Sequence, residues 1–390
     1  IFEAYREYDR RFGQPHRGTW KPHANDRRTD RRLKVGYVSP DFREHACARF
    51  LEPLLAAHDK RAVEVWAYAE LGREDAATRR YQGYVDHWVP TRGLSDEALA
   101  ERIRADGIDV LVDVAGHTVG NRLGVFARKP APVSLSWLGY GTTTGLAAID
   151  YYLTDAASVP EGSEGLFSEE PWRLPAGFVY RPAEGMGEPG PLPALRNGHV
   201  TLGTLTRAVR LNDRMLGVWA EILRRLPQAR LAVDSRSFVD AAAQDALRAR
   251  FAALGIAPER LQVGFHSPPW DVLRGMDISL DCFPHNSGTT LFESLYMGVP
   301  FVTLAGRAGM GTLGSAVLHG LGRPEWIAAS EEEYVAKAVQ FAADVERLAL
   351  IRSGLRENLL SSPLLDSRRF AVQFEDLVRG AWRDWCASAS

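Results

Sequence analysis

The sequence DISLDCFPHNSGTTLFESLYMGVPFVTLAG, residues 277–306, contains an apolar run, a loop of small polar residues, an amphipathic run and a second apolar run. The two apolar runs have the length of strands, whereas the run between them has the spacing of a helix. Parallel strands need a crossover of this kind, because a tight hairpin joins only antiparallel strands. The stretch therefore predicts two strands of one parallel sheet.

The same alternation extends in both directions along the chain. Further strands are predicted at 33–42, 63–70, 108–116, 133–140, 149–155, 200–205, 229–235 and 261–266. Helices are predicted at 95–107, 212–226, 239–254, 269–275, 290–297, 312–320, 330–342, 344–360 and 367–385. Near-continuous apolar strands separated by helices indicate parallel sheets covered on both faces. The predicted fold class is therefore α/β, built from Rossmann-like, doubly wound sheets.

Length and composition indicate two such domains. The chain has 390 residues, and single cores stop growing beyond roughly 250–300 residues. Gly and Pro are concentrated in 186–199 without periodicity, which is typical of an interdomain linker. The predicted parts are an N-terminal region at 1–30, a first lobe at 31–185, the linker, a second lobe at 200–362 and a C-terminal helix at 363–390. Ligands of doubly wound sheets bind beyond the carboxyl ends of the strands.

The N-terminal region is predicted to contain a separate amphipathic helix. Residues 1–14 have the apolar spacing of an amphipathic helix, and such a helix needs a partner for its apolar face. We expect that partner to lie outside this chain. The opening Ile1, in place of Met, suggests that upstream sequence has been removed.

Composition excludes several classes of protein. The formal net charge of −2 and the lack of a long basic run argue against nucleic acid or an anionic membrane as partner. Three widely spaced cysteines without a CxxC pair fit a reducing cytoplasm rather than a disulfide framework. No run reaches the roughly 20 apolar residues of a membrane helix. The motifs HExxH, DxD and GxSxG are absent, and no GxGxxG follows the first strand, so we predict no metal and no cofactor.

The polar loop at Asn286, Ser287, Gly288, Thr289 and Thr290 is the first candidate site. A helix that begins near Thr289 offers free N–H groups and a positive dipole end, and Gly288 permits close approach of a phosphate. The alternative is that Thr289 or Thr290 is an ordinary N-cap. Glu293, one turn into the helix, could accept ribose hydroxyls or simply compensate the dipole.

Other candidates follow strands of the first lobe. His45 could act as a general base, as a donor to a phosphate or as a surface histidine. Asp113 and His117 lie in DVAGHT and could form a proton-handling pair or brace their loop. The loop WLGYGTTTG (137–145) places Tyr140, Gly141 and Thr142 in a position to line the cleft.

The second lobe adds a cationic candidate. Arg210 follows the strand at 200–205 and could neutralise a departing diphosphate in bidentate fashion, although it could also be a solvated charge before a helix. Arg207, three residues earlier, is a rival for that role. Loss of one charge-stabilising group usually costs about 10²–10³ in rate, so Arg210→Ala should be the more damaging change.

Five blocks carry a resemblance to a known family. They are LKVGYVSPDFREH, DVLVDVAGHTVGNRLGVFARKPAPVSLSWLGYGTTTG, DYYLTD, ISLDCFPHNSGTTLFESLYMGVPFVTLAG and SSPLLDSRRFAVQFEDLVRGAWRDW. In order and spacing they resemble the catalytic region of the O-linked N-acetylglucosamine (O-GlcNAc) transferase and SPINDLY family, over about residues 30–387. The resemblance implies a GT-B fold, in which two Rossmann-like domains face a central cleft and a C-terminal helix crosses back. It also implies tetratricopeptide repeats upstream, which would cover the helix at 1–14.

The resemblance assigns roles to individual residues. His45 matches the family's active-site histidine, His117 the histidine of the bacterial GHT block, and Asn286 through Thr290 the phosphate loop. Glu293 stands where an acid usually meets the ribose, and Arg210 stands near a family lysine that contacts the diphosphate. The family's HLALY segment is replaced by PPWDVL, so Trp270 could stack on the base instead, and His266 is a further donor-binding candidate.

The expected activity is that of an inverting, metal-independent glycosyltransferase. The most favoured reaction transfers N-acetylglucosamine from UDP-GlcNAc to Ser or Thr hydroxyls of a protein. The alternatives are a different donor such as GDP-fucose, a glycan or small-molecule acceptor, and a non-catalytic scaffold that binds nucleotide sugars. The general base remains open among His45, His117 and Asp113. Expected partners are a nucleotide sugar and a protein acceptor.

Overall fold

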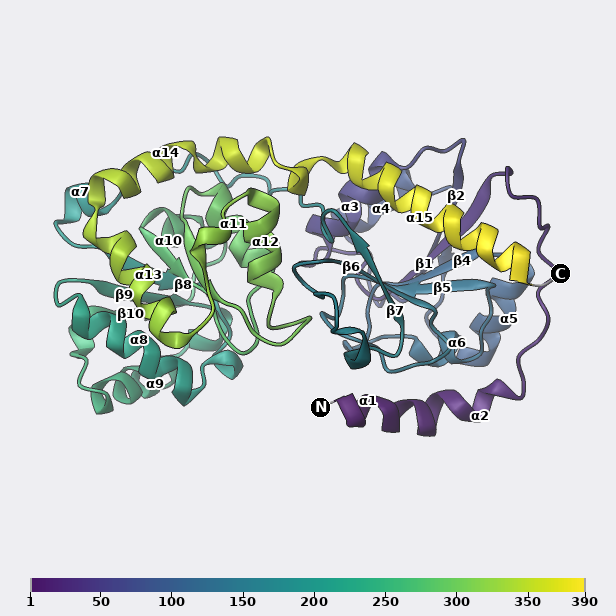
Figure 1. The fold of residues 1–390 in the computed structure, drawn as a ribbon, viewed down its shortest axis with the longest axis horizontal. Coiled ribbons are helices and arrows are strands. Elements are labelled where there is room, and N and C mark those ends of the chain that lie inside the picture. Colours follow the sequence, from purple (N-terminus) through teal and green to yellow (C-terminus); the bar gives the residue numbers. More distant parts are fainter. Residues whose placement is uncertain (1, 389–390) are drawn as a thin grey trace. The chain divides into compact units, whose positions relative to one another are not determined.

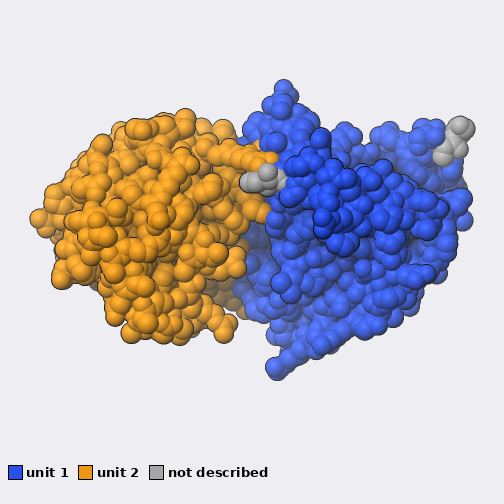
Figure 2. Space-filling model, turned by 90° about the horizontal axis from the view of Figure 1, so that it is seen from below, with its two compact units in different colours: residues 1–181, 365–390 blue, residues 182–364 orange. Residues whose placement is uncertain are grey.

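The computed structural model describes residues 2–388, which divide into two compact units. Of these residues, unit 1 comprises 2–181 and 365–388, and unit 2 comprises 182–364 (Figure 2). Each unit has one sheet with helices on both faces (Figure 1). Among these residues, no helix is both long and apolar enough to span a bilayer.

Unit 1 contains a seven-stranded, wholly parallel sheet in the order β3-β2-β1-β4-β5-β6-β7. Its strands are β1 (Leu33–Ser39), β2 (Val63–Ala69), β3 (His87–Pro90), β4 (Val110–Asp113), β5 (Val133–Ser136), β6 (Tyr151–Asp155) and β7 (Glu170–Leu174). Its helices are α1 (Phe2–Tyr8), α2 (Gln14–Arg17), α3 (Ala48–Ala57), α4 (Ala76–Tyr84), α5 (Asp96–Asp106), α6 (Leu123–Ala127) and α15 (Ser367–Ser388). A π-helical turn, η1 (Asp9–Gly13), joins α1 to α2.

Unit 2 contains a six-stranded parallel sheet in the order β10-β9-β8-β11-β12-β13. Its strands are β8 (Thr201–Thr204), β9 (Arg230–Asp234), β10 (Leu261–Gly264), β11 (Ile278–Leu280), β12 (Phe301–Leu304) and β13 (Ile327–Ala328). Its helices are α7 (Ala194–Asn197), α8 (Asp213–Arg225), α9 (Ala241–Ala253), α10 (Trp270–Arg274), α11 (Thr289–Tyr296), α12 (Leu313–Leu321), α13 (Glu331–Ala343) and α14 (Val345–Leu360).

The helix boundaries follow the local chemistry of the sequence. Ser95 caps α5 by accepting a hydrogen bond from the Ala98 N–H, and Gly107 ends the helix in the left-handed conformation at φ 69°. Asn212 caps α8 by accepting from the Met215 N–H. Caps of this kind satisfy backbone groups that the helix itself leaves unpaired.

The C-terminal helix α15 belongs to unit 1. Its apolar face contributes Phe370, Phe374, Val378 and Trp382 to the core formed by β1, β2, β4 and β5, and it packs along α3 (Figure 1). Burial of large side chains stabilises this packing by about 1.5–3 kcal/mol each. The chain therefore returns to the first unit after completing the second.

Two segments differ from the expectations of the sequence. The Gly/Pro-rich residues 186–199 pack on unit 2, where Met186 and Leu192 are buried and the Ala194 N–H donates to Asp277 Oδ1 at 2.9 Å. The N-terminal helix has a partner within the chain, because η1 and α2 contact α6 and the Ala147 N–H donates to Asp9 Oδ1 at 3.1 Å. A Gly/Pro-rich composition therefore did not mark a free linker, because the segment packs on unit 2 and contains α7.

Candidate active site

Both sheets reverse their strand order at one point. In unit 1 the reversal falls between β1 and β4, and in unit 2 between β8 and β11. At such a point the loops after the two central strands lead away from each other to opposite faces of the sheet, and ligands of doubly wound folds bind there. His45 follows β1, Asp113 is the last residue of β4 and His117 follows it, whereas Arg210 and the polar loop follow β8 and β11.

In unit 2, the polar loop leads to an open helix start. The N-cap of α11 is Gly288, and no side chain accepts a hydrogen bond at that cap. The alternative that Thr289 or Thr290 caps the helix is therefore wrong. The first N–H groups of α11 stay available for an anion, and the helix dipole favours negative charge at the same place.

Two residues of the predicted phosphate loop brace it instead of facing outward. Asn286 is fully buried, where its side chain donates to Cys282 O at 2.8 Å and accepts from the Gly314 N–H at 3.3 Å. Ser287 is 2% exposed, and its N–H donates to Asp281 Oδ1 at 2.7 Å. Gly288, Thr289 and Thr290 are the partly exposed members of the loop. The sequence pattern grouped all five residues, because it does not distinguish residues that support the loop from residues that could contact a ligand.

Asp281 is the anchor of this loop and was missed in the sequence. It is fully buried and accepts hydrogen bonds from Ser287 N, Cys282 N and Thr303 Oγ1 at 2.7, 2.8 and 2.7 Å. Burial raises the pKa of Asp281 to about 7, although these hydrogen bonds oppose the rise. The sequence signal that could have identified it is an acidic residue directly after the apolar run at 278–280.

Arg210 and His285 meet beside the polar loop. Nη2 of Arg210 lies 3.2 Å from Nε2 of His285, and Nε of Arg210 is buried with no hydrogen-bond partner among the described residues. Burial, followed by the charge of Arg210, lowers the pKa of His285 to about 4. A buried guanidinium N–H without an acceptor is costly, and an anionic ligand would satisfy it. Arg207 is exposed, so the structure separates the two rival arginines.

The remaining donor-side candidates lie at different places on unit 2. His266 follows β10, and its Nδ1 lies 2.6 Å from Asp234 Oδ2 at the end of β9. Trp270 begins α10 and packs against a small apolar cluster that includes Leu273 and Met276. Glu293 is partly exposed on α11. The polar loop and Arg210 thus form one group, and His266 with Asp234 forms a second.

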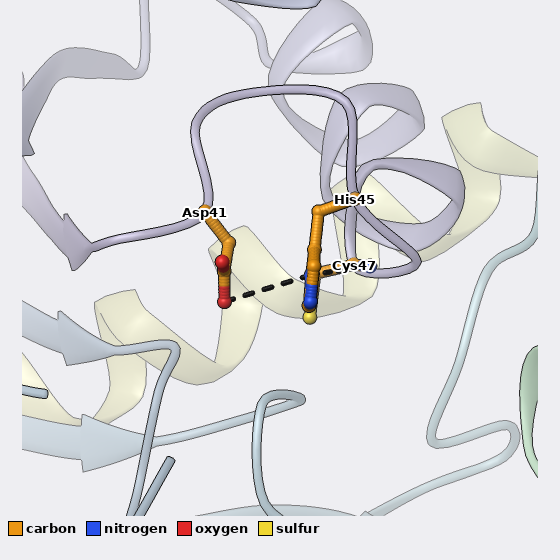
Figure 3. Close-up of side chains that lie close together, drawn as sticks. All are labelled: Asp41, His45 and Cys47. Carbon is orange, nitrogen blue, oxygen red and sulfur yellow. Dashed lines mark hydrogen bonds and ion pairs between the residues drawn. The ribbon is translucent and has the colours of Figure 1, made fainter. Parts of the chain in front are cut away.

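In unit 1, the loop from β1 to α3 holds His45 beside Asp41 (Figure 3). The Cys47 N–H donates to His45 Nδ1 at 3.3 Å, and Asp41 Oδ2 lies 3.5 Å from the same nitrogen. Since Nδ1 accepts, the ring proton of neutral His45 is on Nε2, which makes that atom a hydrogen-bond donor. Burial lowers the pKa of His45 and raises the pKa of the Cys47 thiol to about 12.

Asp113 and His117 bond to different partners, and for Asp113 the structure favours the loop-bracing alternative over a proton-handling pair. Asp113 is buried and accepts from the N–H groups of Ala115 and Gly116 and from Ser136 Oγ at 2.8 Å, which makes it a loop brace. Burial raises the pKa of Asp113 to about 6. Nε2 of His117 lies 2.7 Å from Thr144 O. A carbonyl can only accept, so Nε2 carries the proton and Nδ1 is the basic atom of the neutral ring.

Three tyrosines surround His117. The rings of Tyr8, Tyr140 and Tyr5 have centroids 4.7, 5.4 and 5.5 Å from the imidazole, and the hydroxyls of Tyr5 and Tyr140 are 2.8 Å apart. Tyr140 was predicted to line the cleft, together with Gly141 and Thr142, and all three are partly exposed. The tyrosines of α1 were missed, although their spacing in the amphipathic helix was visible. Burial lowers the pKa of His117.

The chain has the GT-B fold of glycosyltransferases, which consists of two parallel sheets of Rossmann type. The chain belongs to glycosyl transferase family 41, whose model matches residues 13–181 and 195–374. The expected family and fold are thereby confirmed.

Several known proteins are similar to this chain. The probable UDP-N-acetylglucosamine–peptide N-acetylglucosaminyltransferase SPINDLY of Solanum lycopersicum is 37% identical over 99% of this chain and 42% of its own length. The corresponding SEC protein of Arabidopsis thaliana is 29% identical over 92% of this chain and 38% of its own length. The chain thus spans less than half the length of these relatives.

Solved structures agree with this assignment. A mutant of the Thermobaculum terrenum O-GlcNAc transferase has a TM-score of 0.92 and 36% identity, over 100% of this chain and 75% of that chain. Anabaena HepE in complex with UDP has a TM-score of 0.57 at 11% identity, over 90% of this chain and all of its own, which shows the shared fold.

Proposed function

We propose that this chain is an inverting, metal-independent glycosyltransferase that moves N-acetylglucosamine from UDP-N-acetylglucosamine to Ser or Thr hydroxyls of a protein. One observation carries the proposal, namely the set of unoccupied hydrogen-bond donors in unit 2. It combines the uncapped start of α11 with Arg210, whose buried Nε has no partner in the described residues. The printed names of the SPINDLY and SEC relatives support the choice of donor and acceptor.

The group in unit 2 is assigned to the leaving diphosphate. When the glycosidic bond breaks, negative charge builds on the β-phosphate, and fixed donors aimed at that charge lower the barrier. Arg210, the first amides of α11 and the Thr289 and Thr290 hydroxyls supply those donors. Arg210 and the positive end of the α11 dipole supply the charge that a metal ion would otherwise supply, so the proposed reaction needs no metal. Asp281, Asn286 and Ser287 hold the loop in place.

The histidines of unit 1 are assigned to the acceptor side of the reaction. His117 is oriented by Thr144 O so that Nδ1 can take the proton of the acceptor hydroxyl. Because its pKa is lowered, this ring is neutral near neutral pH, and Nδ1 is then free to accept a proton. His45 offers an Nε2–H as a hydrogen-bond donor. Asp113 is a positioning residue, because its oxygens are occupied by the loop it braces.

A ligand and turnover screen tests the proposal. UDP, GDP, UDP-N-acetylglucosamine and GDP-fucose are compared by the rise in melting temperature, since a ligand that binds only the folded state raises it. We expect UDP and its sugar to stabilise most, with slow release of UDP and, with protein or peptide acceptors, labelling of Ser or Thr. If GDP-fucose stabilises most, the proposed donor is wrong. If only glycans are extended, the proposed protein acceptor is wrong. Binding without any release of nucleoside diphosphate would favour a non-catalytic scaffold.

A further inference from the structure

The loop between β1 and α3 brings together three side chains that commonly bind metal ions. Asp41, His45 and Cys47 each offer one ligand atom, and these atoms all lie within 4.8 Å of one another (Figure 3). No other group of three such residues converges in this way within residues 2–388. We propose that this loop binds a thiophilic divalent transition-metal ion, of the Zn²⁺ class, through Asp41 Oδ2, His45 Nδ1 and Cys47 Sγ.

The geometry of the loop favours these atoms. Asp41 Oδ2 lies 3.5 Å from His45 Nδ1, and the Cys47 N–H lies 3.3 Å from the same nitrogen. The lone pair of Nδ1 thus faces both the carboxylate and the residue that carries the thiol. Arg43 occupies the other carboxylate oxygen, since its Nη2 donates to Asp41 Oδ1 at 3.1 Å. Oδ2 is left to face the ring, and an ion on Nδ1 would replace only the long bond from Cys47 N.

The ligand set selects the class of ion. One sulfur, one imidazole nitrogen and one carboxylate oxygen suit Zn²⁺, whereas Mg²⁺ and Ca²⁺ prefer oxygen ligands only. Three protein ligands leave a fourth tetrahedral position for water or another small ligand. On binding, the Cys47 thiol gives its proton to solvent and the thiolate coordinates the ion, so the step requires no oxidant or reductant.

Binding of the ion at this loop should affect the transfer reaction, a consequence that rests on the proposed function. Tetrahedral Zn²⁺ with bonds of roughly 2.0–2.3 Å holds its ligand atoms about 3.5 Å apart. The atoms of Asp41, His45 and Cys47, now up to 4.8 Å apart, must therefore close on the ion. Closing on the ion fixes the His45 ring, whose Nε2–H is the donor assigned to the transfer reaction, in a different geometry. The ion is accordingly an inhibitor of this site and not its cofactor.

Cobalt titration tests the site directly, without any need for turnover. Co²⁺ is added to the reduced chain, and we expect a near-ultraviolet thiolate-to-cobalt band together with visible bands, saturating at one ion per chain. Cys47→Ser should abolish the near-ultraviolet band and weaken binding at least about 10-fold, a loss that even outer residues of metal sites often produce. Cys386→Ser is the matched control. It should change neither the near-ultraviolet band nor the affinity for cobalt, since Cys386 lies on α15. Absence of the band from the wild type, or its survival in Cys47→Ser, would overturn the proposal.

Two further measurements provide a second variant and a test of inhibition by zinc. If Cys47→Ser does not fold, as judged by circular dichroism, Asp41→Asn replaces it and should weaken cobalt binding with the thiolate band retained. In the second measurement Zn²⁺ should inhibit release of nucleoside diphosphate by the wild type, reversibly with a chelator, and should not inhibit Cys47→Ser. Cobalt binding without zinc inhibition would overturn the inhibitory role. A chain that turns over no donor would contradict the proposed function, while the cobalt result would still decide the metal site.

Discussion

Nη2 of Arg210 donates to Nε2 of His285 at a distance of 3.2 Å, across 75 residues of sequence. A guanidinium has no acceptor, so Nε2 must accept and the ring proton of neutral His285 sits on Nδ1. Burial, followed by the charge of Arg210, lowers the pKa of this ring from its ordinary 6.5 to about 4. His285 is therefore neutral at physiological pH, and negative charge beside it would favour its cationic form.

Binding of UDP should be accompanied by uptake of protons. The diphosphate draws the Arg210 guanidinium to itself and favours the charged imidazole, so the pKa of His285 rises on binding. Calorimetry in buffers of different ionisation enthalpy measures the uptake, which should be largest between pH 4 and 6.5. His285→Asn should bind UDP with less uptake. Equal uptake by the wild type and the variant would show that another group takes the proton.

Arg210→Ala should lower the rate of donor turnover by about 10²–10³-fold, because it removes a charge that stabilises the leaving diphosphate. Arg207→Ala provides the control, since that side chain is exposed and three residues away. Arg210→Lys should recover part of the loss, because a lysine keeps the charge but not the planar fork of donors. Steady-state kinetics of the three variants test this order, and a similar loss in Arg207→Ala would contradict the assignment.

Asp281→Asn should change how stability depends on pH. Burial raises the pKa of Asp281 from its ordinary 3.8 to about 7, so the folded state keeps a proton that the unfolded state has lost. The resulting stabilisation is fully present below pH 3.8 and disappears as the pH rises to about 7. Melting temperatures across this interval should therefore fall less in Asp281→Asn than in the wild type. His23 and His285, whose pKa values are lowered, act in the opposite direction in both proteins.

Gly116→Ala should destabilise unit 1 and displace the loop that carries Tyr140. Gly116 has φ +54°, and a Cβ added there would lie 2.3 Å from the Cβ of Tyr140. Gly93→Ala is the matched control, because Gly93 has φ +89° but nothing lies within 4 Å of the added Cβ. The control should lose only the roughly 1–2 kcal/mol of left-handed backbone strain. Chemical denaturation should show the larger loss in Gly116→Ala.

Tyr5→Phe should lower transfer to a protein acceptor and leave UDP affinity unchanged. The substitution removes the hydroxyl that lies 2.8 Å from Tyr140 OH, and a bond of this kind contributes about 1 kcal/mol. Because Tyr5, Tyr140 and His117 all belong to unit 1, the loss should appear with the acceptor varied and not with the donor. Arg6→Ala, on the exposed side of α1, should have no effect. A parallel loss of UDP affinity would contradict a role confined to unit 1.

Much of the fold was readable from local pattern. The predicted strands at 33–42, 63–70 and 277–283 contain β1, β2 and β11, and the caps Ser95 and Asn212 mark the starts of α5 and α8. By contrast, β3, β7 and β13 were not predicted. They lie at sheet edges and have two to five residues, so their strand geometry depends on pairing with β2, β6 and β12 rather than on their own sequence.

The sequence by itself determined the periodicities, the turns and the residue types at the carboxyl ends of the strands, because each depends on neighbours within a few positions. Only the tertiary structure decided which of those residues meet. Arg210 and His285 are brought together by the adjacency of β8 and β11, and His117 is oriented by Thr144 and enclosed by Tyr5 and Tyr8. Strand order and the burial of individual side chains arise from packing over the whole unit, which no local pattern specifies.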